Sequence, residues 1–420
     1  MDQTALREFL ETKKTAAETS VHDRQAIQDS FADLELLKIA ISETSSLEEA
    51  EILLNLAMQG VMIVHPRDEK DIFAKYNFLN TLAKDQVHKI QEAHWITLLD
   101  IMRCGNLRIP VLSLPLTPEY LIPPFDRTEH KLFQARQSIV EEKKNQLLAI
   151  LKLFESKGDI PIILGALTGR LARFLKGNGI KSPLVTGIYL TPWIISGILE
   201  QIATIASERV IDFRIALVGG AGNMGQAILN WLIAEGFAEN LTIIEATENE
   251  LGSLSKHYPE IGTKDLLTDI NAGVKDKDIV IVATASPRAL INADMLSPGT
   301  IVIDDTHPSN VGKDIQNDKI QILRVMAHVP ELSYVFPMDQ KKPDEAVTCL
   351  AEGIIVAENR DALTSDYHQA LVNPERAVQL FLMRKISRMA EELGISSAPF
   401  RDYENFVPEQ TIVSIRSLRE

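Results

Sequence analysis

The sequence predicts an α/β protein in which a doubly wound parallel sheet is joined to a second α/β domain, with helices added at both ends. Three observations predict this fold class. Short strands rich in Val and Ile alternate with helical stretches from Arg214 onward. A glycine-rich turn joins the first of these strands to a helix. The 420 residues, 45% of them hydrophobic, exceed one domain of roughly 150 residues.

The N-terminal half is expected to form two parts. Residues 1–60 predict a helical extension, because their apolar side chains recur at helical spacing. Residues 61–195 predict an α/β domain with a helix over 129–156 and a second helix that starts at Thr191, where Pro192 fits the first turn. The apolar segments expected to form its strands are Val61–Val64, Ile109–Pro115, Ile160–Leu164 and Leu184–Val185.

The glycine turn reads Gly220-Ala221-Gly222-Asn223-Met224-Gly225, between a predicted strand over 214–219 and a predicted helix over 224–235. In this strand–turn–helix context, G-x-G-x-x-G is typical of dinucleotide binding. Gly220 allows the tight turn, Gly222 lets the backbone approach a pyrophosphate, and Gly225 lets helix and strand pack closely. The pyrophosphate would lie at the helix N-terminus, beside Asn223 and Met224. The turn therefore predicts a nicotinamide-dependent oxidoreductase.

We expect this turn to belong to a Rossmann-type domain over residues 196–345. A C-terminal helical region over residues 346–420 is expected to pack between the domains. The further predicted strands of the Rossmann sheet are Leu241–Glu245, Asp278–Ala283, Thr300–Ile303 and Lys319–Val325.

The choice between the two nicotinamide dinucleotides depends on Glu245, at the end of the second predicted strand. A carboxylate at this place accepts hydrogen bonds from the adenosine ribose and repels a 2′-phosphate. No Arg or Lys occurs in the five residues that follow. The sequence therefore favours NADH, with NADPH as the alternative.

Polar residues follow the next two predicted strands. Thr284-Ala285-Ser286 comes after one strand, and Asp304 follows the other. Ligands of doubly wound sheets bind at the carboxyl ends of the strands, so we expect these residues to contact the dinucleotide. The same residue types are also common in turns that hold no ligand.

Cys349 occupies the start of a predicted apolar helix. A helix N-terminus lowers the pKa of a thiol and favours the nucleophilic thiolate, whereas the alternative for a lone cysteine is core packing. The other cysteine, Cys104, is distant in sequence, and no Cys or His spacing indicates a metal site. Both cysteines are expected to remain thiols in a reducing, cytoplasmic compartment.

Charge and hydropathy exclude other classes of protein. The net charge of -15 is unfavourable for nucleic-acid binding, and no apolar run reaches the roughly 20 residues that cross a membrane. Nor does the N-terminus have the pattern of a secretory signal. Residues 131–181 hold ten basic and four acidic side chains, a net of +6, and could form a docking face for an anionic partner or an ordinary solvated surface.

From about Val61 to the C-terminus, the sequence resembles the long-chain acyl-acyl-carrier-protein reductases, as a divergent member. The residues that carry the resemblance are Thr186-Gly187 with Thr191, the turn Gly220–Gly225 before Trp231-Leu232, Asp304 with Pro308 and Asn310, and Cys349 with Ala351-Glu352. The resemblance implies that Cys349 is the acyl-accepting nucleophile. It also implies NADPH and an arginine after the second strand, where this sequence has Ala246. Asp305, Thr306 and His307 replace two glycines and a tyrosine of the family pattern.

The leading hypothesis is the reduction of an acyl thioester to an aldehyde through an acyl-enzyme on Cys349, with acyl-carrier protein or coenzyme A as the acyl carrier. Thr186 and Thr191 are candidate donors to the oxyanion. His328 and His307 are candidate acids for the departing thiolate, because imidazole titrates near neutral pH.

Two other hypotheses remain. One is an alcohol or hydroxy-acid dehydrogenase of shikimate-dehydrogenase architecture, with no covalent step and with activity that is insensitive to thiol alkylation. The other is a non-enzymatic dinucleotide-sensing protein, in which the acidic N-terminal helices, with twelve acidic and five basic residues over 1–60, form the interaction module.

Overall fold

The computed structural model describes residues 58–65, 97–114, 116–122, 130–156, 158–286, 289–307, 309–312, 315, 317–334, 343–372, 375–403 and 405–419. The predicted N-terminal extension, up to residue 57, lies outside these ranges. The chain forms two compact units. Unit 1 comprises residues 1–186, 330–344 and 353–368, and unit 2 comprises residues 187–329, 345–352 and 369–420. The four-part division expected from the sequence stays a prediction.

Unit 1 contains a six-stranded sheet in the order β13-β2-β3-β1-β4-β5. The central strand β1 runs parallel to β3 and β4, and β2 forms an antiparallel hairpin with β3. The sequence predicted all of these strands except β2 and β13. The strands are β1 (Val61–Val64), β2 (Thr97–Cys104), β3 (Leu107–Ser113), β4 (Ile162–Leu164), β5 (Leu184–Val185) and β13 (Leu332–Tyr334).

The long helix α7 (His130–Glu155) corrects one expectation about the basic segment 131–181. Lys143 is fully buried, because it lies on the same helix face as Leu147 and Leu151, which belong to the apolar core of unit 1. It therefore cannot contact a partner at the surface. Exposed basic residues of the segment include Lys152, Arg170, Arg173 and Lys181. Within the described ranges, the other α-helices that begin in unit 1 are α6 (Pro118–Leu121), α8 (Ala172–Gly177) and α14 (Arg360–Val372).

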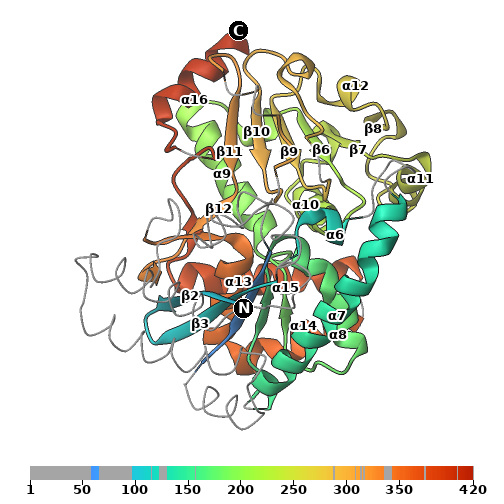
Figure 1. Ribbon diagram of the computed structural model, residues 1–420. Helices are drawn as coiled ribbons and strands as arrows, with labels where there is room; N and C mark the ends of the chain where they lie inside the picture. The colour runs from blue at the N-terminus through green and yellow to red at the C-terminus, as the bar shows by residue number, and fades with distance from the viewer. Residues whose placement is uncertain are drawn as a thin grey trace, which may run out of the picture. The chain divides into compact units, whose positions relative to one another are not determined.

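Unit 2 contains a parallel six-stranded sheet in the order β11-β10-β9-β6-β7-β8 (Figure 1). The predicted doubly wound α/β fold class is confirmed. Chain order reverses beside β6, because β7 and β8 extend the sheet on one side and β9 to β11 on the other, as in the Rossmann order. The strands are β6 (Ile215–Val218), β7 (Leu241–Ile244), β8 (Leu266–Leu267), β9 (Ile279–Val282), β10 (Ile301–Asp304) and β11 (Gln321–Arg324).

The central strands of this sheet are fully buried, which is the pattern of a parallel sheet covered on both faces. A second, small sheet has the order β14-β12-β15. Its strands are β12 (Met326–His328), β14 (Glu345–Val347) and β15 (Ser396–Ser397). The longer helices of unit 2 are α9 (Thr191–Ala206), α10 (Asn223–Ala234), α11 (Glu248–His257), α15 (Arg376–Glu392) and α16 (Glu409–Arg416), with the shorter α12 (Ile270–Val274).

Helix α9 is three residues shorter than the predicted helix, which extended to Arg209. It ends where Ser207 adopts a left-handed conformation, with φ of 57°, and donates its amide to Ala203 and Thr204 carbonyls. Among the described helices, none combines the length and apolar composition that a membrane-spanning helix needs.

Helix α16 is anchored by a buried arginine. The Arg416 guanidinium lies 2.6 Å from the Glu208 carboxylate and 3.3 Å from the carboxylate of Asp278, which precedes β9. It also donates to the Gly299 carbonyl at 3.1 Å. The arginine thus connects the C-terminal helix to the edge of the sheet where these strands begin.

Replacing Arg416 by Met is expected to lower the free energy of unfolding by about 3–5 kcal/mol, because two carboxylates lose a buried partner. Urea denaturation measures this loss. The control is Arg209→Met, which removes an exposed ion pair to Asp212 and is expected to cost less than about 1 kcal/mol. Equal losses in the two variants would contradict the anchoring role of Arg416.

Candidate functional site

The glycine turn lies between β6 and α10 and is formed by close backbone contacts. Gly219, one residue before the predicted turn, has φ of 91°, in the left-handed region that favours glycine. A Cβ on Gly225 would lie 1.9 Å from the Gly219 carbonyl oxygen, and one on Gly220 would lie 2.5 Å from the Ile243 side chain. Only glycine therefore allows the helix, the turn and the neighbouring strand to pack at these distances.

Gly222 differs from these glycines. A Cβ there would have the Gly219 carbonyl oxygen at 3.5 Å and the Ala283 carbonyl oxygen at 4.0 Å as its nearest neighbours, so the protein itself leaves room for a side chain. The first helical hydrogen bond runs from the Gln226 amide to the Gly222 carbonyl, at 2.8 Å. Amides of the first turn of α10 therefore precede the helical hydrogen-bond ladder, and this cradle fits a pyrophosphate.

Glu245 follows β7, and its carboxylate accepts a hydrogen bond from the Ala221 amide in the glycine turn. Burial raises the pKa of the Glu245 carboxyl, against the effect of this hydrogen bond. Two more carboxylates, Glu248 and Glu250, lie in the first turn of α11. The negative charge of these carboxylates therefore disfavours a 2′-phosphate on the adenosine ribose of a dinucleotide bound at the turn.

The loop after β9 lies against the glycine turn. A Cβ on Gly219 would lie 2.8 Å from the Ala283 carbonyl oxygen and 2.9 Å from Thr284 Cβ. Two residues further on, the buried Ser286 donates its amide to Asn310 Oδ1 at 3.3 Å, and its carbonyl accepts from Asn310 Nδ2 at 2.6 Å. Asn310 thus holds the loop after β9 to the loop after β10, which brings two predicted site segments together.

Asp304, at the end of β10, is fully buried and makes its hydrogen bonds within the protein. Its carboxylate accepts from the Thr306 amide at 2.9 Å, from the Ser309 hydroxyl at 3.0 Å and from the Tyr403 hydroxyl. Burial raises the pKa of the neighbouring Asp305 to about 7, although Arg324 acts in the opposite direction. Asp304 therefore orders the loop, and its predicted contact with a dinucleotide remains a prediction.

Cys349 is the second residue of helix α13 (Thr348–Glu358) and is 8% exposed. The backbone of Gly187 lies directly against it, since a Cβ on Gly187 would be 3.1 Å from both N and Cα of Cys349. Gly187 has φ of 85°, in the left-handed region. The sequence predicted the helix N-terminus at Cys349, but not the backbone contact with Gly187.

Hydrogen bonds of two kinds hold the N-termini of α13 and α9 together, one between hydroxyls and one from backbone amides to a carboxylate. The Thr191 hydroxyl, at the start of α9, donates to the Thr348 hydroxyl at 2.7 Å. The fully buried Glu352 carboxylate accepts from the Tyr189 and Leu190 amides, each at 2.8 Å. Burial, with the nearby Glu352 charge, raises the pKa of the Tyr189 hydroxyl. Two helix N-termini, each with a partial positive charge, therefore meet beside Cys349.

The sequence named Glu352 only as part of the resemblance and gave it no role. A charged residue within the apolar part of a helix is the signal that could have found it, because a buried carboxylate needs donors. Its donors are backbone amides, which no pattern of side chains reveals.

For three other predicted residues, the structure gives only a place in the fold. Met326 of β12 pairs with Val347 of β14, whereas His328 pairs with Glu345. Val347 is two residues before Cys349, so the Met326 end of this ladder is the end next to Cys349. The backbone of His328 is at the opposite end, about 7 Å along the strand from Met326. His307 is half-buried after β10, and Thr186 belongs to unit 1. Their catalytic roles remain predictions.

Known proteins resemble this chain in part. A profile of the shikimate/quinate 5-dehydrogenase family matches residues 201–329, which lie in unit 2 and contain the glycine turn. The aminotransferase PigE of a Serratia species is 24% identical over 263 residues, which are 60% of this chain and 30% of that protein.

Two relatives are reductases. The long-chain acyl-[acyl-carrier-protein] reductase of Synechococcus elongatus is 22% identical over 177 residues, which are 41% of this chain and 51% of that protein. The glutamyl-tRNA reductase of Acaryochloris marina is 24% identical over 158 residues, 36% of each. The chain thus spans about a third to a half of the length of these relatives. Together with the fold, they support an oxidoreductase of the dehydrogenase or reductase kind with a nicotinamide dinucleotide as cofactor.

Two glycine substitutions separate folding from dinucleotide binding. Gly222→Ala is expected to change stability by less than about 0.5 kcal/mol but to weaken NADH binding at least tenfold, about 1.4 kcal/mol, because its Cβ would occupy the place of the pyrophosphate. Gly225→Ala is expected to destabilise the fold itself, since its Cβ would meet backbone atoms.

Urea denaturation and titration of NADH fluorescence give the two readouts. The control is Gly252→Ala, where a Cβ has no neighbour within 4 Å. Unchanged NADH affinity in Gly222→Ala would contradict the placement of the pyrophosphate.

Proposed function

We propose that this chain reduces an acyl thioester to an aldehyde through an acyl-enzyme on Cys349, with NADH as the preferred reductant. The observation that carries the proposal is the position of Cys349 where the N-termini of α13 and α9 meet. Such a position stabilises a thiolate and also the oxyanion that forms when a carbonyl is attacked.

In the first half-reaction, the Cys349 thiolate attacks the carbonyl carbon of the thioester. The carbon–sulfur bond to the carrier breaks, the carrier leaves as a thiolate that takes up a proton, and the acyl group remains on Cys349. His328 and His307 are the candidate donors of this proton.

In the second half-reaction, a nicotinamide dinucleotide held at the glycine turn Gly220–Gly225 would supply a hydride for the acyl carbon. The bond between this carbon and the Cys349 sulfur then breaks, which releases the aldehyde and restores the thiolate. One thioester, one NADH and one proton give one aldehyde, one free carrier thiol and one NAD⁺.

The surrounding residues hold the nucleophile and the oxyanion donors. Glu352 fixes the turn before α9, and Gly187 lets that turn approach the Cys349 backbone. Amides in the first turn of α13 are the candidate oxyanion donors. The Thr191 hydroxyl donates its one proton to Thr348 here, so it could serve as a donor only after releasing that hydrogen bond. The hydroxyl pair Thr191–Thr348 sets the relative position of the two helix ends.

The acyl carrier is proposed to be an acyl-carrier protein or coenzyme A, both of which are anionic. The exposed basic residues of the segment 131–181 are candidates for this contact. The names of two relatives add support, because each describes a reductase that acts on an acyl group attached to a carrier.

Incubation with acyl thioesters in the absence of NADH is expected to add one acyl group to the protein, located on Cys349 by mass spectrometry. Cys349→Ser is expected to abolish the adduct and to lower thioester reduction by about 10³-fold or more.

The matched control is Cys104→Ser. Burial raises the pKa of the Cys104 thiol to about 11, and this thiol contacts the Pro330 carbonyl oxygen at 3.4 Å, so acylation and activity should be retained. An adduct that persists in Cys349→Ser, or full activity of that variant, would refute the covalent mechanism.

The preference for NADH is proposed to depend on Glu245. Glu245→Ala is expected to raise the ratio of kcat/KM for NADPH to that for NADH about tenfold, because a repulsive charge beside the 2′-phosphate is lost. Steady-state kinetics with both cofactors measure the ratio. Glu239→Ala, an exposed carboxylate outside the cofactor cradle, should leave the ratio unchanged. A ratio unaffected by Glu245→Ala would assign the preference to other residues.

A second candidate is an alcohol or hydroxy-acid dehydrogenase without covalent catalysis. The match of the shikimate/quinate 5-dehydrogenase profile to residues 201–329 favours it. The two candidates differ in their response to thiol alkylation, which stops the thioester reductase and leaves such a dehydrogenase active.

A further inference from the structure

Unit 2 has a groove along one side of α9, which we call the α9 groove. Its volume is about 730 Å³. The α9 residues recur at helical spacing, so a whole face of that helix forms its floor. The lining residues are Trp193, Ser196, Gly197, Glu200, Gln201, Thr204 and Ile205 of α9, Trp231 and Glu235, Glu391, and Ser396, Ser397, Pro399, Phe400, Phe406, Val407 and Glu409.

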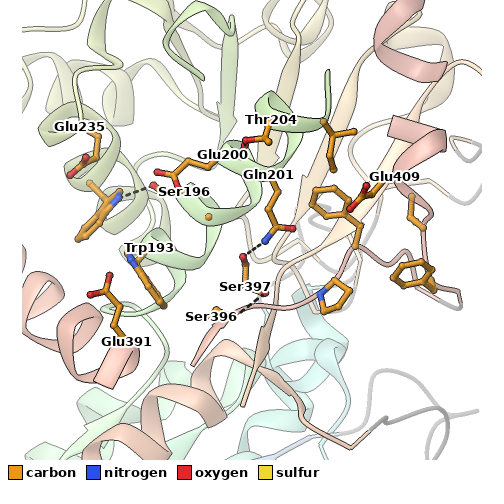
Figure 2. A pocket seen from close by; sticks show the side chains of 17 residues that line it. Trp193, Ser196, Glu200, Gln201, Thr204, Glu235, Glu391, Ser396, Ser397 and Glu409 are labelled. Atoms are coloured by element: carbon orange, nitrogen blue, oxygen red, sulfur yellow. Dashed lines mark hydrogen bonds between the residues drawn. The ribbon is translucent and has the colours of Figure 1, made fainter. Parts of the chain in front are cut away.

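The chemistry of the groove is acidic and aromatic. Four carboxylates and four aromatic rings line it, with no lysine or arginine among its lining residues. In the described part of the chain, Glu200, Glu235, Glu391 and Glu409 have no ion-pair partner. Figure 2 shows Glu391 beside Trp193, and Glu200 and Glu235 toward the same end of the groove, whereas Glu409 lies at the other end. Such a lining favours cationic and apolar groups together.

A face of α15 has the complementary chemistry. It lines a second hollow and consists of Ala377, Leu380, Phe381, Arg384, Lys385 and Arg388, which we call the α15 face. Phe381 is 61% exposed, which is unusual for so large an apolar side chain. Within the described ranges, the Arg384 and Arg388 guanidinium groups have no ion-pair partner.

The two surfaces adjoin at the end of α15. Glu391, which lines the groove, comes three residues after Arg388 and so lies on the same side of the helix. Phe381 and Glu391 are about 15 Å apart along the helix, and the groove follows α9 for about 18 Å from Trp193 to Ile205. The face therefore matches the groove in length as well as in charge.

We propose that a second copy of this chain docks here, with the α15 face of each protomer in the α9 groove of the other. Because face and groove adjoin, a twofold axis near Arg388 and Glu391 forms both contacts at once and closes the dimer. Arg388 of each protomer then meets Glu391 of the other, and Phe381 enters the aromatic part of the groove. Complementary surfaces on one chain favour this partner over an unrelated protein.

The test is a charge swap on the full chain, followed by sedimentation velocity. Wild-type protein is expected to sediment as a dimer of 46.8 kDa protomers that dissociates as salt is raised. One variant, Arg384→Glu with Arg388→Glu, reverses the charge of the α15 face. The other, Glu235→Lys with Glu391→Lys, reverses the charge of the α9 groove. Each variant alone is expected to be monomeric, because both of its contacts place like charges together.

An equimolar mixture of the two variants is expected to recover the dimer. One contact then pairs the reversed face with the reversed groove, and the other pairs the native surfaces. The control for the reversed face is Lys256→Glu with Lys275→Glu, which makes the same change in net charge as that variant at exposed positions outside both surfaces and should leave the dimer intact. A monomeric wild type, reversed variants that remain dimeric, or a mixture that stays monomeric would each overturn the proposal.

Discussion

The buried carboxylate of Glu352 is the interaction on which the arrangement around Cys349 depends. It accepts two amide hydrogen bonds from the turn before α9, so the N-terminal ends of two helices are fixed side by side. A buried carboxylate is costly unless donors surround it, and the Tyr189 and Leu190 amides, just before α9, supply them. Removing this charge would free the turn that positions Gly187 and Thr191. The geometry beside the thiol therefore rests on a residue that takes no part in the proposed bond changes.

Helix α9 connects the two chemical parts of unit 2. At its start it contacts Thr348, next to the cysteine, and one turn later Ser196 accepts a hydrogen bond from Trp231 of α10 at 2.8 Å. Helix α10 itself begins in the glycine turn, so α9 packs against an element of each site. The remaining face of α9 lines the α9 groove. A single helix thus contributes to the proposed acyl site and to the proposed contact between protomers, and it packs against the helix that follows the glycine turn.

Much of unit 2 was predictable, because buried parallel strands are continuous apolar runs and the glycine turn has a fixed spacing. The strands β8 and β2 were missed, since β8 has only two residues and the apolar run of β2 is interrupted by Asp100. The left-handed Gly219 was also missed, because a pattern of glycines does not show which one bears the positive φ. At the site, the position of Glu245 after a strand predicted a role in cofactor choice, and the resemblance predicted that Cys349 is a nucleophile; both roles stay predictions. The bonds that orient these residues involve backbone amides far away in the sequence, such as those of Tyr189 and Leu190, and no local pattern encodes these.

The chain passes between the two units five times, and α13 itself is divided after Glu352. Residues 330–344 and 353–368, which belong to unit 1, are synthesised after most of unit 2. The edge strand β13, from this late segment, pairs with β2 more than 200 residues earlier. During translation, the β2 edge of the unit 1 sheet therefore stays unpaired until residues 332–334 have been synthesised. Neither unit is a contiguous segment, so neither can be obtained as one uninterrupted piece of the chain.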